Sequence, residues 1–105
     1  MDRIIKRFGE KALLKFLSTS EIELIKSNKT AAGFWALKEA VSKALGTGIG
    51  KECSFHDIEI FKTQRGAPYF ILNADIIQKF NIKDTSVSIT HDGEYAIAVV
   101  AIQTN

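Results

Sequence analysis

The sequence lacks the features of a disulfide framework, a membrane anchor or a metal cluster. It has one cysteine, Cys53, so no internal disulfide can form, and no second cysteine or histidine stands at metal-site spacing. We therefore expect Cys53 to be a small buried hydrophobic residue. No apolar run approaches the ~20 residues of a membrane span, and the N-terminus lacks a signal-peptide centre. The prediction is a cytoplasmic protein with no membrane partner.

The net charge of +2 is too small to indicate a nucleic-acid partner, and we expect none. The charge is unevenly placed, because residues 1–16 hold five lysines and arginines against two acidic residues. A composition of 46% apolar and 25% charged residues favours an ordered domain over a disordered chain. A length of 105 residues predicts one domain with a modest core, so oligomerisation would be a natural way to bury more surface.

The N-terminal segment has the spacing of an amphipathic helix. Apolar residues recur at steps of three and four from Ile4 to Leu17. Beside this stripe, at steps of four, stands a basic row made of Arg3, Arg7, Lys11 and Lys15. The segment is therefore predicted to be a helix with one basic face.

Two further helices are predicted before the sequence changes its period. A short one restarts after the first, with Ser18 and Glu21, or alternatively Ser20 and Glu23, spaced as a capping box. A longer helix covers about residues 30–45, and the glycine that follows it is expected to take the left-handed conformation of a helix terminator.

In the second half of the sequence, apolar and polar residues alternate with a period of two, which indicates strands. They are predicted over residues 54–62, 68–72, 85–91 and 94–102. Asn73 caps a short helix to about Phe80, and Asp92-Gly93 predicts a type I′ hairpin between the last two strands. Helices followed by a mostly antiparallel sheet indicate an α+β domain.

Spacing alone leaves the chemistry of three features open. Glu39 and Lys43 lie off the apolar side of the long helix, either as an exposed ion pair or as a Mg²⁺ ligand with a phosphate-binding cation. The glycines of residues 46–50 either end the helix or present N–H groups to an anion. His91, at a strand end, is either a structural hydrogen-bonding group or a catalyst.

The long helix and its loop carry a specific motif. Residues 35–50, WALKEAVSKALGTGIG, resemble the signature F-A-A-K-E-A-x-S-K-A-L-G-T-G-I-G of the small bacterial 4′-phosphopantetheinyl transferases, the holo-acyl-carrier-protein synthases. The family's order continues with SFHDIEI at 54–60, GAPY at 66–69 and SITH at 88–91. The closing YAIAVV at 95–100 also fits, so the resemblance covers essentially the whole chain.

The resemblance implies a homotrimer of the 4′-phosphopantetheinyl transferase fold, with active sites between neighbouring subunits. Such an enzyme moves the phosphopantetheine arm of coenzyme A onto a serine of apo-acyl-carrier protein, as fatty acid biosynthesis requires, and releases adenosine 3′,5′-bisphosphate. Mg²⁺ would neutralise charge on the pyrophosphate and position both partners.

Roles carry over from the resemblance by position. Glu39 would be a metal ligand, Lys43 would hold the pyrophosphate, and Ser42 would line the same cleft. The nucleotide end of coenzyme A would contact Gly66, Ala67, Pro68, Thr90 and His91. The acidic carrier protein would meet the basic row of Arg3, Arg7, Lys11 and Lys15.

Two features depart from the family pattern. Family members begin with a strand G-x-D-I-V-x-I whose Asp is the other protein ligand of Mg²⁺. This chain begins at Met1-Asp2-Arg3, so residues 1–105 are expected to form a single, N-terminally shortened domain, and Asp2 does not take that role. Phe34 stands where relatives often carry Arg. Two alternatives stay open: an impaired or inactive relative that binds coenzyme A or the carrier, and a structural trimer module.

Overall fold

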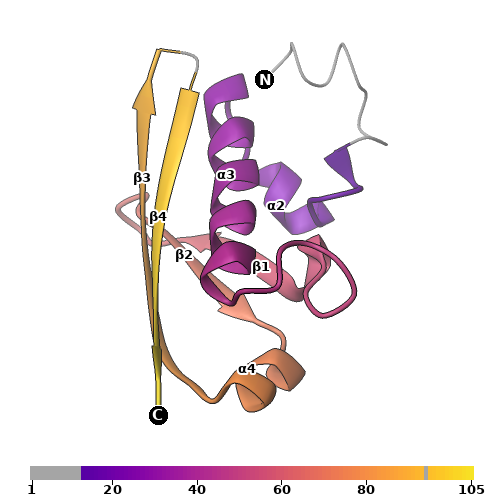
Figure 1. The fold of residues 1–105 in the computed structure, drawn as a ribbon. Helices are drawn as coiled ribbons and strands as arrows, with labels where there is room; N and C mark the ends of the chain where they lie inside the picture. The colour runs from indigo at the N-terminus through magenta and orange to yellow at the C-terminus, as the bar shows by residue number, and fades with distance from the viewer. Residues whose placement is uncertain (1–12, 94) are drawn as a thin grey trace.

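The computed structural model describes residues 13–93 and 95–105, which form an α+β arrangement (Figure 1). The elements in chain order are α2 (Thr19–Glu23), α3 (Asn28–Ala44), the 3₁₀ turn η1 (Phe55–Asp57), β1 (Ile58–Lys62), β2 (Pro68–Leu72), α4 (Ala74–Phe80), β3 (Ile82–Asp92) and β4 (Tyr95–Thr104). Three residues of the predicted basic row, Arg3, Arg7 and Lys11, lie outside the described residues.

Serine caps start the first two described helices. Ser18 Oγ accepts from the backbone N of Glu21 at 3.2 Å, and Ser18 N donates to Glu21 Oε1 at 2.8 Å, which completes the capping box at the first of its two predicted positions. Ser27 Oγ accepts from Thr30 N at 3.2 Å, so α3 begins two residues before the predicted start. Gly46 ends it with a φ of 81°, as predicted.

The strand predicted over residues 54–62 is wrong in its first part. Asp57 Oδ2 accepts from the backbone N of Ser54 at 2.8 Å and from its Oγ at 3.1 Å, which closes the η1 turn. Only after this turn does β1 begin, at Ile58, and pair antiparallel with β2. Ile58 and Ile60 of β1 are buried.

The last two strands form a long antiparallel hairpin that extends beyond the predicted ends of both. Asp92 pairs with Tyr95, and Gly93 in the turn has a φ of 62°. Among the described residues, the predicted antiparallel pairing is divided between two two-stranded sheets, β1–β2 and β3–β4. The sheet positions of the site are therefore carried by two separate hairpins.

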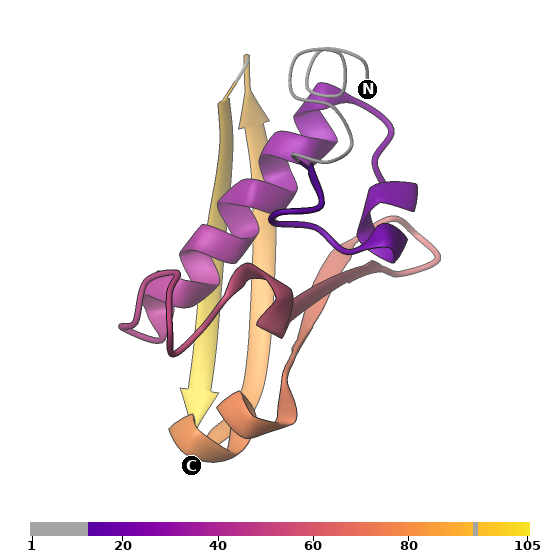
Figure 2. The same ribbon diagram turned by 90° about the vertical axis from the view of Figure 1, so that its right-hand side faces the viewer.

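Helix α3 lies along one face of the β3–β4 hairpin. Helix α2 lies on the side of α3 that faces away from this hairpin (Figures 1 and 2). The buried apolar core contains Leu13, Leu17, Phe34, Leu37, Val41, Cys53, Ile58, Ile60, Phe70, Leu72 and Ile76. Cys53 is fully buried, as predicted. Within the described residues, no helix combines the length and apolar character needed to cross a membrane.

On the face of the hairpin that points away from α3, strand β4 presents an exposed apolar row opposite polar residues of β3. Tyr95 is 78% exposed, Ile97 54% and Val99 65%, and all three project from the same side of β4. Monomeric proteins seldom leave such a contiguous apolar row in water.

Candidate active site

Helix α3 separates the predicted site residues between two of its faces. At about 100° per residue, Glu39 lies ~140° and Lys43 ~180° around the helix from Phe34. Phe34 is buried, Glu39 is half-buried and Lys43 is exposed, in agreement with this geometry. The carboxylate and ammonium predicted to handle metal and pyrophosphate therefore point away from the face that carries Phe34.

No ion pair joins Glu39 to Lys43, so the exposed intrahelical pair that the sequence left open is absent between these two residues. Ser42 lies between them in sequence, but its side chain is fully buried, and its Oγ donates to Glu39 O at 2.8 Å. Ser42 accordingly supports the helix turn that carries Glu39.

The glycine loop after α3 acts mainly as a helix terminator. The backbone N–H groups of Thr47 and Gly48 both donate to Ser42 O, each at 3.1 Å, and Gly50 N donates to Cys53 O at 2.9 Å. These three N–H donors are therefore used by backbone carbonyls of the same chain. They are not presented to an anion as the donors of a phosphate-binding loop would be.

On the opposite face of α3, a cavity of about 170 Å³ brings together residues from three distant segments. It is lined by Thr30, Gly33, Phe34, Lys62, Gly66, Pro68, Ile89 and His91. Three of the five residues predicted to contact the nucleotide end of coenzyme A are therefore gathered here: Gly66, Pro68 and His91. Lys62 and His91 can carry positive charge, and none of the described lining residues is acidic, so the cavity favours an anionic group.

Lys62 was not identified from the sequence. Its Nζ stands 5.9 Å from the centroid of the Phe34 ring, within reach of a cation–π contact. It thus places a positive charge beside the position where relatives often carry Arg. Its place at the end of β1, directly before the turn that leads to Gly66, was the available signal.

Two other predicted contact residues lie outside this cavity. Ala67 is exposed in the β1–β2 turn, where its N donates to Thr63 Oγ1 at 3.1 Å and its O accepts from Thr63 N at 2.9 Å. Thr90 is exposed opposite Ile97 and points to the other face of β3 from His91, because successive strand residues alternate.

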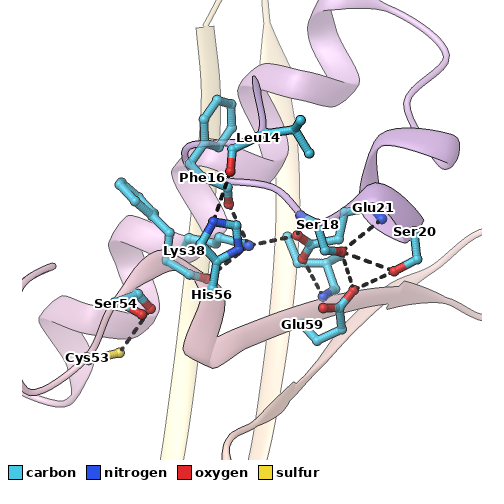
Figure 3. A network of polar contacts seen from close by, with 12 residues as sticks. Leu14, Phe16, Ser18, Ser20, Glu21, Lys38, Cys53, Ser54, His56 and Glu59 are labelled. Atoms are coloured by element: carbon cyan, nitrogen blue, oxygen red, sulfur yellow. Dashed lines mark hydrogen bonds and ion pairs between the residues drawn. The ribbon is translucent and has the colours of Figure 1, made fainter. Parts of the chain in front are cut away.

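The residue directly before Glu39 forms a buried ion pair that the sequence reading missed. Lys38 Nζ donates to Glu21 Oε1 at 2.8 Å, and both side chains are fully buried (Figure 3). The ammonium also donates to Phe16 O at 2.7 Å and to Phe55 O at 3.0 Å. Burial lowers the pKa of Lys38, while the hydrogen bond and charge of Glu21 oppose that shift.

An aromatic cluster lies one helical turn before Glu39. The rings of Phe16, Trp35 and Phe55 contact one another. The centroids are 5.2 Å apart for Phe16 and Trp35, 6.0 Å for Phe16 and Phe55, and 5.0 Å for Trp35 and Phe55. Trp35 is 46% exposed although its ring contacts both phenylalanine rings. Lys15, the one described member of the basic row, is exposed beside Phe16. The cluster therefore joins the residue that follows Lys15 to the turn of α3 that precedes Glu39.

The metal prediction depends on a small donor set. Across residues 13–93 and 95–105, no three His, Cys, Asp or Glu side chains gather as a ligand cluster. Mg²⁺ in proteins often takes only one or two carboxylates and completes its shell with water and substrate phosphates. Glu39, half-buried and not paired with Lys43, is compatible with an ion shared in this way.

Comparisons by sequence and by structure find relatives with the same named activity. The family model of the 4′-phosphopantetheinyl transferase superfamily matches residues 1–100. The holo-[acyl-carrier-protein] synthase of Sulfurimonas denitrificans is 62% identical over 103 residues, covering 98% of this chain and 85% of that protein. The crystal structure of the Helicobacter pylori holo-[acyl-carrier-protein] synthase in complex with coenzyme A matches with a TM-score of 0.89 and 50% identity, over 97% of this chain and 90% of that one. The corresponding Bacillus anthracis synthase, in complex with CoA (3′,5′-ADP), matches with a TM-score of 0.79 and 34% identity, over 98% and 89%.

Proposed function

This chain belongs to the 4′-phosphopantetheinyl transferase superfamily, and on that premise we propose that it acts as a holo-[acyl-carrier-protein] synthase. It transfers the 4′-phosphopantetheine group of coenzyme A to a serine of apo-acyl-carrier protein and releases adenosine 3′,5′-bisphosphate. The observation that carries this proposal is the cavity that joins Gly66, Pro68 and His91 with Lys62 in a chain so similar to a synthase crystallised with coenzyme A. The cavity would hold the nucleotide end of coenzyme A.

In the transfer step, the serine oxygen forms a bond to the phosphorus that bears the pantetheine arm. The bond from this phosphorus to the bridging oxygen breaks, adenosine 3′,5′-bisphosphate leaves with the electron pair, and the serine proton is released. When bound, Mg²⁺ neutralises charge on the pyrophosphate. Glu39 would hold the ion, and the exposed Lys43 would bind the pyrophosphate as a point charge.

The separation of the two halves on α3 supports a shared site in a homotrimer. The cavity uses Thr30, Gly33 and Phe34, whereas Glu39 and Lys43 lie on the other side of the helix and ~7–14 Å further along its axis. One subunit would therefore supply the cavity and its neighbour would supply Glu39. The exposed apolar row of Tyr95, Ile97 and Val99 is a surface that such an assembly would bury.

The carrier protein would approach the basic row and the aromatic cluster. The carrier is acidic, and the exposed Lys15 lies beside Phe16, whose ring contacts Trp35. Basic residues would steer the encounter, and a half-exposed tryptophan next to Glu39 would give the bound carrier an apolar anchor.

The activity is tested by incubating the protein with coenzyme A, Mg²⁺ and an apo-acyl-carrier protein, and following the carrier by mass spectrometry. We expect a mass gain of one phosphopantetheine group, lost when the carrier serine is replaced by alanine and strongly reduced by chelation of Mg²⁺. A carrier that never gains mass contradicts the activity. Titration of coenzyme A then separates the alternatives, because a binding relative still takes up the ligand and a structural module ignores it.

The shared site has a test of its own, based on two variants that are each defective. Glu39→Gln removes the predicted metal ligand, and His91→Ala removes the cavity histidine. If neighbouring subunits build one site, subunit exchange between the two variants creates sites with both residues intact. We expect the mixture to exceed the summed rates of the separate variants severalfold. A mixture that shows only their mean rate, after subunit exchange is verified, contradicts a shared site.

A further inference from the structure

The buried Glu21–Lys38 pair organises backbone as well as charge. Lys38 uses all three ammonium donors, one on Glu21 and two on the carbonyls of Phe16 and Phe55. Glu21 in turn accepts from the backbone N of Ser18 at 2.8 Å and from that of Ile60 at 2.7 Å. The pair thus ties α3 to four backbone positions outside it (Figure 3).

A second carboxylate extends the same network toward the surface. Glu59 Oε2 accepts from Ser18 Oγ at 2.7 Å and from Ser20 Oγ at 2.8 Å (Figure 3). Among the described residues, no buried side-chain nitrogen or oxygen lacks a hydrogen-bond partner. A fully satisfied network of this kind rigidifies the elements that it joins.

Stability alone is a weak reason for such a pair. Desolvating two charges is costly, and apolar side chains of similar volume often replace a buried ion pair with little loss or even a gain of stability. Apolar side chains cannot hold the two carbonyls of Phe16 and Phe55 at fixed positions. The property that only the charged pair supplies is the placement of those two backbones.

Both backbones belong to rings of the aromatic cluster. Phe16 and Phe55 both contact Trp35 and also contact each other, and Lys38 lies one turn along α3 from Trp35. One ammonium group therefore binds the backbones of the two residues whose rings contact the exposed indole. Glu39 follows Lys38 in the chain and lies within one turn of Trp35, about 5–6 Å between Cβ atoms.

We infer that Glu21 and Lys38 are positioning residues for carrier recognition. The pair holds the cluster of Phe16, Trp35 and Phe55 in the shape that the carrier protein meets beside Glu39. This inference rests on the proposed function, because it takes the acyl-carrier protein as the partner. It adds that carrier affinity depends on a buried pair that touches neither substrate, whereas binding of the nucleotide end of coenzyme A, in the cavity on another face of α3, does not.

The test replaces the charged pair by neutral groups of similar size, Glu21→Gln together with Lys38→Met. Trp35 is the sole tryptophan, so its emission reports on the cluster directly. In the folded variant we expect the apparent KM for the carrier to rise at least about tenfold while the KM for coenzyme A stays within twofold. The emission should shift to the red and acrylamide should quench it more strongly.

A matched control makes the same two substitutions in an exposed pair. Lys79 Nζ stands 3.4 Å from Glu52 Oε2, and both side chains are 57% exposed. The variant Glu52→Gln with Lys79→Met should keep wild-type emission and both wild-type KM values. Wild-type carrier KM and wild-type emission in a folded Glu21→Gln, Lys38→Met variant would overturn the inference.

A second variant keeps the inference testable if the neutral pair prevents folding. Phe55→Leu removes one ring of the cluster but keeps the backbone carbonyl that Lys38 binds. It should raise the carrier KM without changing that for coenzyme A, and unchanged carrier recognition would overturn the inference.

Binding without chemistry separates this inference from the proposed activity. A tryptophan-free apo-carrier is titrated without coenzyme A, and Trp35 emission is recorded. If the wild type binds the carrier but transfers nothing, the proposed activity is contradicted. The inference is still supported in that case if the variants bind the carrier more weakly than the wild type does. If the variants bind as the wild type does, the inference fails while the activity stands.

Discussion

The ring of His91 lies directly against the backbone of α3 at Gly33. A Cβ at Gly33 would stand 3.4 Å from His91 Cε1 and 3.3 Å from Ile89 Cγ2, closer than most side chains approach. A glycine inside a helix costs roughly 0.5–1 kcal/mol relative to alanine. Its presence is therefore explained by the close approach of β3, which seats the imidazole in the cavity.

Gly33→Ala should displace His91 and weaken coenzyme A binding. The gain in helix propensity offsets part of the steric cost, so the free energy of unfolding should change by less than about 1 kcal/mol. We expect the KM for coenzyme A to rise about threefold or more and the KM for the carrier to stay unchanged in steady-state kinetics. Gly50→Ala is the control, because nothing lies within 4 Å of a Cβ there. A wild-type KM for coenzyme A in Gly33→Ala would contradict this role.

Glu39→Gln tests the predicted metal ligand with little change of size or helix propensity. The lost charge should lower transfer to apo-carrier by at least about a hundredfold, or ~2.7 kcal/mol at the barrier. The measurement is the initial rate at saturating Mg²⁺. Glu23→Gln, an exposed position in α2, should keep the wild-type rate. Near-normal turnover of Glu39→Gln would remove Glu39 from the metal site.

The parts of the fold that could be read from the sequence are those decided by short-range chemistry. The Ser18 capping box, the left-handed Gly46 and the hairpin at Gly93 each follow from residues only a few positions apart. The η1 turn is local too, since Asp57 bonds Ser54, but the alternation of apolar residues there favoured a strand. Two local signals competed, and the side-chain hydrogen bonds determined the turn.

The family motif, and not the periodicity of the sequence, predicted which residues would meet in the cavity. The resemblance predicted that Gly66, Pro68 and His91 contact the same substrate, and the structure brings these three residues to one cavity. Periodicity could not assign Lys38 to a buried pair, because its partner Glu21 lies 17 positions away in another helix. Lys62 and Gly33 were missed for the same reason: their roles depend on strands and helices that meet only in the folded chain.

Lys15→Glu tests carrier steering at the described member of the basic row. Reversing an exposed charge should raise the apparent KM for the acidic carrier and weaken its salt dependence, because steering charges are screened within ~10 Å at 0.1 M salt. The KM for coenzyme A should not change. Lys83→Glu, exposed on β3, is the charge-matched control. If both KM values rise together in Lys15→Glu, the row has a structural or nucleotide-binding role.

Cys53 should make the stability of the protein depend on alkaline pH. Burial, and secondarily the charge of Asp57, raises the pKa of this thiol above its ordinary value of 9.0. The folded state thus keeps the proton at a pH where the unfolded chain loses it. The thiol's contribution is complete below pH 9.0 and is lost as pH rises from there through the folded pKa.

The contribution of Cys53 can be isolated by comparison with Cys53→Ala. Lys38 acts in the opposite direction, because its lowered pKa makes stability rise with pH up to its ordinary value of 10.5. This term is the same in both proteins and cancels in their difference. In urea titrations, we expect the wild type's advantage over Cys53→Ala to be constant from pH 7 to 9 and to shrink above pH 9. The native thiol should also react with a disulfide reagent at least about tenfold more slowly than in urea. A stability difference independent of pH, or rapid labelling of the native protein, would contradict the burial of this thiol.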